Sequence, residues 1–162
     1  MKLYLKRNTI DSGIGFEIYD QAENIVFHVA ATVDSSLKMA VESRVGEPFS
    51  MIRFNTLLFP YFTVRCQRHF YVLVPCLGER FAFAIYGSTY KFSGDLGAGA
   101  FTMTDAQGKI LMTMEKTLTR SGSEAYELEI HDTDRRMFLI SAAICAAAYQ
   151  VLAEPSAQQA CC

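Results

Sequence analysis

The side chains that are able to do acid–base chemistry in this chain do not form a recognisable catalytic pattern. The three histidines, His28, His69 and His131, are widely separated, and none belongs to the HExxH spacing of a zinc peptidase or adjoins a nucleophile elbow. Glu127 and Glu129 share one face of a predicted strand, as the paired carboxylates of a glycosidase would. Alternate acidic residues on a strand are, however, more typical of a solvated face. We therefore expect a protein without enzymatic activity.

The glycines and cysteines do not have the spacing of a cofactor or metal site. The glycine-rich segment 94–99 lacks the Lys-Ser/Thr ending of a phosphate-binding loop and precedes a predicted strand instead of a helix. No two cysteines have the two-residue spacing that is typical of zinc sites. The five cysteines are Cys66, Cys76, Cys145, Cys161 and Cys162. We expect reduced thiols and neither cofactor nor metal, with a Cys66–Cys76 bridge and a lipid on the last two cysteines left open as alternatives.

Charge is unevenly distributed along the chain. Overall, 15 Lys and Arg stand against 17 Asp and Glu, a formal net charge of −2, which argues against nucleic acid as a partner because nucleic-acid-binding domains are usually basic. Residues 49–92, however, hold five cations and a single acid. The cations are Arg53, Arg65, Arg68, Arg80 and Lys91, and the acid is Glu79. This middle segment is therefore suited to face an anionic surface.

Most of the chain has the pattern of short strands separated by turn residues. Phe81, Phe83 and Ile85 alternate with smaller or polar neighbours, which indicates a sheet with one dry and one wet face. The predicted strands are 2–6, 15–20, 25–33, 37–43, 49–57, 61–67, 70–77, 80–86, 89–93, 100–104, 109–118 and 124–131. About twelve strands avoid exposed edges by closing into an antiparallel barrel, and a barrel of this size has room for a central helix.

The strongest helix signal lies near the C-terminus. Residues 137–153, MFLISAAICAAAYQVLA, are apolar on all sides, so a helix there must be buried all round. Its length of roughly 25 Å matches the height of a barrel whose strands have about seven residues. Asp132 or Thr133 is expected to cap it. The segment is shorter and richer in alanine than a usual membrane span, so we predict a buried axis and no transmembrane helix.

The predicted organisation is a single domain. It spans 1–155, with the helix taken as 134–154, and a short tail at 156–162 is expected to be disordered. The start of the chain has basic residues but no continuous apolar run of the length that a secretory signal needs. We therefore expect a cytoplasmic protein, located at a membrane surface if it binds lipid.

A hairpin motif occurs twice in the chain. The copies are FEIYDQAENIVFHV at 16–29 and FTMTDAQGKILMTM at 101–114, which align without a gap. Asp20 and Asp105 begin the two turns, where a carboxylate accepts hydrogen bonds from turn amides, so a structural role is expected for both. Gly108 can supply the positive φ of the second turn, and Asn24 is expected to supply it in the first.

These residues, in this order, resemble the LURP-one-related family, which belongs to the tubby C-terminal-like group together with the phospholipid scramblases. The resemblance covers residues 2–154. It rests on FEIYD at 16–20, LLFPY at 57–61, YKFSGDL at 90–96, FTMTDAQGKI at 101–110 and the alanine-rich final helix. It implies a twelve-stranded barrel around a C-terminal helix and a function in binding. The chain departs from the group in having no Trp and no turn glycine in its first hairpin, and the lipid-binding basic residues of tubby domains have no matched positions here.

Three classes of function remain open. In the first, Arg53, Arg65 and Arg80 on the outer face of neighbouring strands bind anionic phospholipid or phosphoinositide, because guanidinium groups can hold phosphate. Leu58 and Phe59, in the apolar turn between Arg53 and Arg65, would then contact the membrane. The alternative for this turn is a plug at one end of the barrel, formed by Leu57, Phe59 and Phe62. The second class is a protein-interaction or scaffold domain, and the third, an enzyme or small-ligand barrel, is disfavoured because the helix occupies the barrel.

Overall fold

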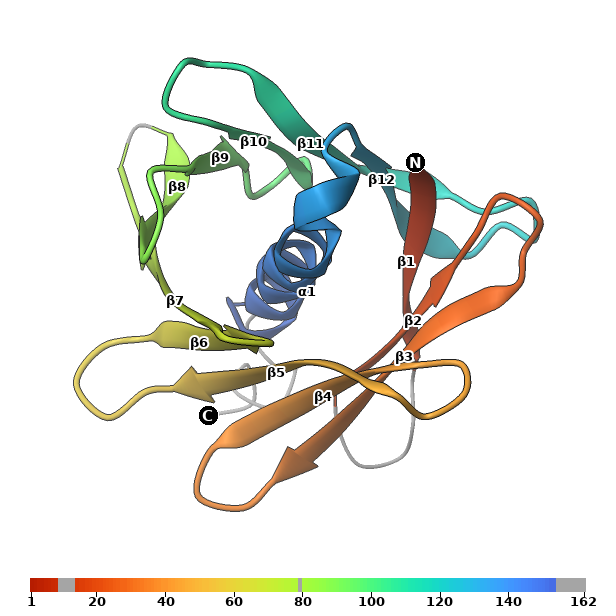
Figure 1. Cartoon of the computed structure of the whole chain (residues 1–162), viewed down its shortest axis with the longest axis horizontal. Coiled ribbons are helices and arrows are strands. Elements are labelled where there is room, and N and C mark those ends of the chain that lie inside the picture. The colour runs from red at the N-terminus through yellow and green to blue at the C-terminus, as the bar shows by residue number, and fades with distance from the viewer. Residues whose placement is uncertain (9–13, 79, 154–162) are drawn as a thin grey trace, which may run out of the picture.

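The computed structural model describes residues 1–8, 14–78 and 80–153, which form a closed antiparallel barrel of twelve strands around one helix (Figure 1). The strands are β1 (Lys2–Asn8), β2 (Gly15–Tyr19), β3 (Ile25–Val33), β4 (Leu37–Ser43), β5 (Pro48–Asn55), β6 (Tyr61–Cys66), β7 (His69–Cys76), β8 (Phe81–Tyr86), β9 (Lys91–Asp95), β10 (Ala100–Thr104), β11 (Ile110–Leu118) and β12 (Glu124–Ile130). Each strand pairs with the next along the chain, and β1 pairs with β12 to close the sheet. The predicted fold class is therefore confirmed.

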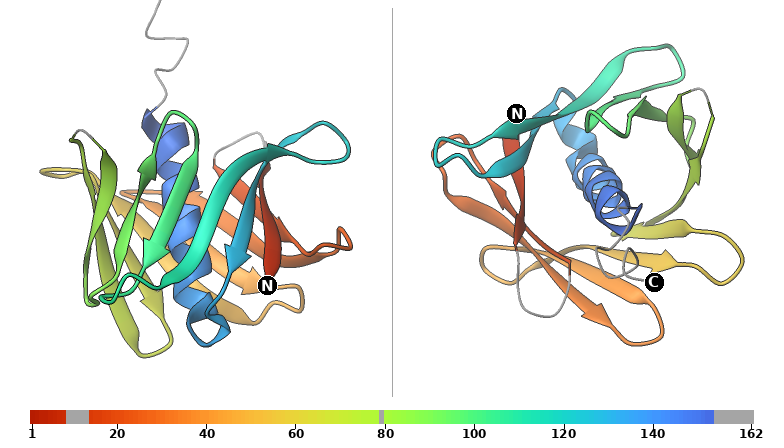
Figure 2. Two further views of the ribbon diagram at one scale, coloured as in Figure 1. Left: turned by 90° about the horizontal axis from the view of Figure 1, so that it is seen from above. Right: turned by 180° about the vertical axis from the view of Figure 1, so that it is seen from behind.

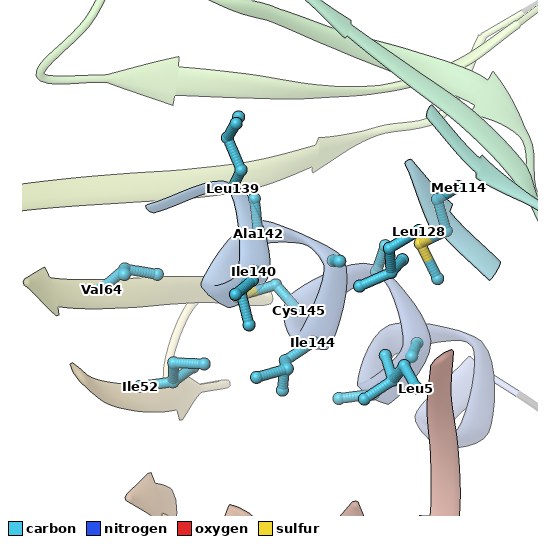
Figure 3. Close-up of a cluster of buried hydrophobic side chains, with 14 of the residues drawn as sticks. Leu5, Ile52, Val64, Met114, Leu128, Leu139, Ile140, Ala142, Ile144 and Cys145 are labelled. Atoms are coloured by element: carbon cyan, nitrogen blue, oxygen red, sulfur yellow. The ribbon is translucent and has the colours of Figure 1, made fainter. Parts of the chain in front are cut away.

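The helix α1 (Arg136–Ala153) runs through the barrel, as the two views in Figure 2 show. All its residues from Phe138 to Ala148 are buried. Isoleucines and alanines of the helix pack against inward-facing side chains of several strands, among them Leu5, Ile52, Val64 and Leu128 (Figure 3). The small alanine side chains allow the helix to approach the barrel wall closely, above all at β5 and β6. By length and composition alone, the segment Thr133–Ala153 would be able to cross a membrane, but here it is the core of the barrel.

The start of the helix differs from the prediction. A 3₁₀ turn, η1 (Thr133–Arg135), precedes α1, and Asp132 makes no capping hydrogen bond with its side chain. The Asp132 carboxylate instead accepts a hydrogen bond from the Arg135 guanidinium. An ion pair with Arg135 thus takes the place of the expected cap at Asp132.

Several strand boundaries also differ from the prediction by one or two residues, among them those of β8 and β9. The strand predicted at 80–86 begins at Phe81, and the strand predicted at 89–93 lies at Lys91–Asp95, so that Gly94 is part of β9 and not of a bend. Gly94 pairs with Phe101 of β10 and with Phe81 of β8. A Cβ atom at this position would overlap the carbonyl oxygen of Ala100. Glycine therefore permits a close backbone approach inside the sheet. In a sequence, the same glycine indicates a turn, which is why a bend was predicted here.

The two repeated hairpins have the same local structure. The Asp20 Oδ1 atom accepts hydrogen bonds from the amides of Ala22 and Asn24 at 2.8 and 2.9 Å, and Asp105 Oδ1 accepts the equivalent bonds from Gln107 and Lys109. The strand register shifts at the equivalent place in both copies, after Ile18 and after Met103. The predicted structural role of the two aspartates is confirmed.

The residue with positive φ in the first turn is not Asn24. Glu23 has a φ of 64°, and the equivalent Gly108 has a φ of 84°. Equivalent positions of a repeat share backbone conformation even where one copy lacks the favourable residue. A side chain at Glu23 is therefore strained, since this region of φ is unfavourable for residues with a Cβ atom.

We expect Glu23→Gly to raise the free energy of unfolding by about 0.5–1 kcal/mol, because it removes the Cβ strain at positive φ. Gly108→Ala is expected to lower it by a similar amount, for the same reason. Denaturant unfolding of both variants would measure the two effects. If Glu23→Gly lowers the free energy of unfolding as Gly108→Ala does, the Glu23 side chain is not strained and this prediction is wrong.

The barrel has two distinguishable ends. We call the end at which α1 starts the N-terminal end and the end at which it finishes the C-terminal end. Because the strands alternate in direction, the turns β3–β4 (34–36), β5–β6 (56–60) and β7–β8 (77–80) all lie at the C-terminal end. The Gln150 amide near the end of α1 donates a hydrogen bond to the Leu96 carbonyl in the β9–β10 turn, which is consistent with this assignment.

Candidate functional site

The tip of the β5–β6 hairpin is the most exposed apolar segment among the described residues. Leu57 is 93% exposed, Leu58 87% and Phe59 52%, whereas Phe62, the second residue of β6, is fully buried. The predicted plug of the barrel end is therefore wrong for Leu57 and Phe59 and right only for Phe62. Phe62 faces inward by strand alternation, but the residues of the turn project beyond the barrel wall, so they have no core to enter (Figure 1).

The exposure of these side chains is costly unless something covers them. Burying a leucine or phenylalanine side chain contributes about 1.5–3 kcal/mol, and contiguous exposed apolar residues usually mark a contact surface. Leu57, Leu58 and Phe59 are consecutive and are followed by Pro60, which has no amide hydrogen to donate. The hairpin tip is thus built to be apolar and exposed, which makes it the centre of the candidate site.

Two of the predicted arginines lie next to each other on the hairpin that carries this tip. Arg53 of β5 is opposite Thr63 of β6, and Arg65 of β6 is opposite Met51 of β5. The two arginines are therefore diagonal neighbours, with Cα atoms about 7–8 Å apart. Both are exposed on the outer face. Neither forms an ion pair within the part of the chain that the structure describes.

Lys38 is a third cation of this surface, and sequence reasoning missed it. It lies on β4 directly opposite Arg53. Lys38 Nζ is 3.0 Å from an oxygen of Asp34, and this hydrogen bond is the main reason why the pKa of Asp34 is lowered to about 2. Like charges directly opposite each other are unfavourable, and Asp34 offsets part of this repulsion. Strand alternation alone predicts the face on which Lys38 lies but not its partner, because the partner depends on the register of β4 and β5.

Arg80 does not join the other two arginines. It is exposed in the β7–β8 turn, and β7 separates β8 from β6, so it is not on a strand next to Arg65. It adjoins the exposed Leu77 in the same turn, at the C-terminal end of the barrel. The predicted cluster of three therefore divides into a pair on the outer wall and a single arginine at a hairpin tip.

The remaining candidate residues have ordinary partners or none. His28, His69 and His131 are exposed, and His28 Nδ1 is 3.8 Å from a Glu17 oxygen. Glu127 forms an ion pair with Lys2, with an oxygen–nitrogen distance of 2.7 Å. Within residues 1–8, 14–78 and 80–153, no three His, Cys, Asp or Glu side chains are close enough to hold a metal ion.

Cys66 and Cys145 are buried like small apolar residues, whereas Cys76 is exposed. Cys66, Cys76 and Cys145 are all free, so the alternative of a Cys66–Cys76 bridge is wrong. Burial raises the pKa of the Cys66 and Cys145 thiols. Cys66 Sγ lies 3.8 Å from the Ser141 hydroxyl of α1, which also makes a 2.7 Å hydrogen bond with Ser50. Cys161, Cys162 and the predicted tail at 156–162 lie outside the described residues.

Two surface hollows lie away from the tip of the β5–β6 hairpin. One, of about 610 Å³, lies on the outer wall beside β1, between the β2–β3 and β11–β12 turns. Tyr19 in this hollow donates a 2.5 Å hydrogen bond to Glu17, which raises the pKa of Tyr19 to about 12. The other, of about 660 Å³, lies at the start of α1, where Arg135 is 5.6 Å from the centre of the Tyr90 ring. Cys66 and His69 both line the second hollow, but Cys66 Sγ lies against the Ser141 hydroxyl and burial raises the pKa of its thiol, which makes it a poor nucleophile.

Comparison with known proteins does not assign the chain to a family. No protein-family model, no curated protein and no solved structure matches the chain. Membership of the LURP-one-related family therefore stays a prediction.

Proposed function

We propose that this protein is a non-enzymatic binding module that docks on anionic membrane surfaces, at phosphatidylserine or phosphoinositide headgroups, through its β5–β6 hairpin. The observation that carries the proposal is the hairpin itself, whose tip exposes Leu57 and Leu58 almost completely in front of unpaired cations. The predicted kinship with tubby-like and scramblase-like proteins supports a binding function as well. A cytoplasmic location at a membrane surface follows from the proposal.

The arrangement has the physical requirements of an interfacial anchor. Apolar side chains at a protruding tip can enter the boundary between headgroups and acyl chains. Each nearby Lys or Arg contributes about 1 kcal/mol of attraction to an anionic leaflet. Arg53 lies close behind the tip on the outer face of β5, so it can contact headgroups while the tip is inserted.

Catalysis and small-molecule binding inside the barrel have less support. The helix α1 occupies the barrel axis, which leaves no lipocalin-like interior for a ligand. Cys66 and Tyr19, two side chains in the hollows that could act as nucleophiles, both have a raised pKa, which disfavours the ionised form that a nucleophile needs.

Sedimentation with vesicles tests the proposal. The full chain is expected to sediment with phosphatidylcholine vesicles that contain phosphatidylserine or phosphatidylinositol bisphosphate, and to stay in solution with phosphatidylcholine alone. Binding should weaken as salt is raised, because the attraction between exposed charges is screened. Absence of binding to either anionic vesicle at low salt would overturn the proposed function.

A protein-interaction domain is the second candidate, and a different surface favours it. Phe70 of β7 lies directly opposite Arg65, and both Phe70 and Tyr86 of β8 are more than half exposed on the outer wall. Exposed aromatic residues beside an arginine are typical of protein contact sites. A chain that does not bind vesicles at low salt would make this wall the surface to test, by substituting Phe70 and Tyr86 with serine in binding assays.

A further inference from the structure

We propose that three consecutive hairpins, and not the β5–β6 hairpin alone, form one membrane-docking face. This inference rests on the proposed function and adds to it the extent of the docking face and the orientation of the barrel on the bilayer. The three-hairpin face consists of Val33 beside the β3–β4 turn, Leu57, Leu58 and Phe59 in the β5–β6 turn, and Leu77 in the β7–β8 turn.

The apolar residues of this face are exposed to a similar degree. Val33 is 69% exposed and Leu77 is 79% exposed, next to the two almost fully exposed leucines of the β5–β6 turn. The three hairpins are neighbours in the barrel and lie at its C-terminal end. In Figure 1 the β3–β4 and β5–β6 hairpins project to the lower left and left, and β7 and β8, which flank the third turn, lie on the same side of the barrel. One flat surface can therefore touch all three.

Charges on this face complement an anionic partner. Arg53 and Arg80 are exposed and form no ion pair within the described part of the chain; Glu79, beside Arg80, lies outside it. The acid of the β3–β4 turn, Asp34, is already held by Lys38. Three cations, Lys38, Arg53 and Arg80, stand against two acids, Asp34 and Glu79, in these hairpin ends, so the face carries a formal excess of one positive charge.

The β11–β12 hairpin, whose turn also lies at the C-terminal end but on the other side of the barrel axis, has a different character. The β11–β12 turn also exposes a leucine, Leu118, which is 67% exposed. Its hairpin projects to the right in Figure 1, next to the β2–β3 turn. That turn contributes Asp20 and Glu23 to the same hollow that Leu118 and Arg120 line. The hollow is lined by three acids, Asp20, Glu23 and Glu127, against two cations, Lys6 and Arg120, so this side has an excess of negative charge and suits an anionic membrane less well than the three-hairpin face.

The spacing of the apolar residues favours a bilayer over a protein. Protein interfaces have a contiguous apolar core surrounded by a polar rim. Here the apolar side chains are distributed over three separate tips, with polar strand ends between them. A fluid interface accepts separate insertions at several points, because lipids adapt to each tip without a matching shape. We therefore infer that the barrel stands tilted on the membrane, with the three tips inserted and β11–β12 directed away.

Single tryptophan residues can test this orientation, since the chain contains no tryptophan. The variants Val33→Trp, Leu58→Trp and Leu77→Trp place one fluorophore on each tip, and Leu118→Trp is the matched control in an exposed hairpin on the other side. Each variant is mixed with phosphatidylcholine–phosphatidylserine vesicles with and without brominated acyl chains. The three tip variants are expected to show a blue shift and quenching by the brominated lipid, and Leu118→Trp neither. Circular dichroism and thermal unfolding check that each variant is folded.

The outcomes separate this inference from the proposed function. If the protein sediments with vesicles and only Leu58→Trp responds, the three-hairpin face is wrong and membrane binding stands. The same holds if no tryptophan responds although the variants sediment, or if Leu118→Trp responds as strongly as the three tips. Failure of wild-type protein to sediment at low salt would overturn the proposed function itself, and this inference with it.

Discussion

Replacing Phe62 with alanine is expected to lower the free energy of unfolding by about 3–5 kcal/mol, the usual cost of removing a buried aromatic side chain. Phe62 is fully buried, and its ring centre lies 4.7 Å from that of Phe54 and 6.3 Å from that of Phe83. The substitution would therefore leave a cavity between the barrel wall and its aromatic neighbours. Denaturant unfolding monitored by circular dichroism gives the measurement.

Phe59→Ala is the matched control in the same hairpin. Phe59 is about half exposed and contacts Tyr61 at a ring-centre distance of 5.5 Å, so its loss should cost less than about 1 kcal/mol of stability. It should instead weaken vesicle binding, because it removes apolar area from the tip. If Phe59→Ala destabilises the protein as much as Phe62→Ala, the tip is packed in solution and the assignment of an exposed anchor is wrong.

The behaviour of this hairpin shows what the sequence was able to predict and what it was not. The apolar residues at 57–62 indicate side chains that become buried in some contact, but the same sequence is compatible with a plug of the barrel and with an exposed tip. The difference depends on how far the hairpin extends beyond the wall, which is a property of the whole barrel. Of the three residues in the predicted plug, only Phe62 is buried, because it lies within β6, where strand alternation turns it inward.

The architecture itself was predictable because two independent patterns required it. A helix that is apolar on all sides must be buried on all sides, and a closed barrel of about twelve strands can surround it. The position of Ala143 and Ala147 at zero exposure in the barrel axis confirms that reasoning. Boundaries were less predictable, as Gly94 shows, since a glycine that permits close strand approach has the same sequence signature as a turn.

The cation site was only partly predictable, because it depends on register. Arg53 and Arg65 were placed on one face by alternation, and β5–β6 pairing makes them neighbours. Lys38 became their neighbour only through the register of β4 with β5. Arg80 was assigned to a strand that begins one residue later, so its separation from Arg65 followed from the positions of β7 and β8.

Reversing the charge of Arg53 and Arg80 together is expected to weaken binding to anionic vesicles by on the order of a hundredfold or more. Each cation near an anionic leaflet contributes about 1 kcal/mol, and a glutamate in its place replaces attraction by repulsion. Both residues are exposed, so Arg53→Glu/Arg80→Glu should keep the fold and its thermal stability. Arg65→Glu should have a smaller effect, because Arg65 lies farther from the β5–β6 tip than Arg53.

The control for this experiment has the same change of net charge on the other side of the barrel. Arg44 in the β4–β5 turn and Arg120 in the β11–β12 turn are exposed, and both turns project to the right in Figure 1, away from the three-hairpin face. Arg44→Glu/Arg120→Glu is therefore expected to bind vesicles with nearly wild-type affinity at moderate salt, where distant charges are screened. Equal losses in the two double variants would show that net charge alone, and not a defined docking face, governs the attraction to the membrane.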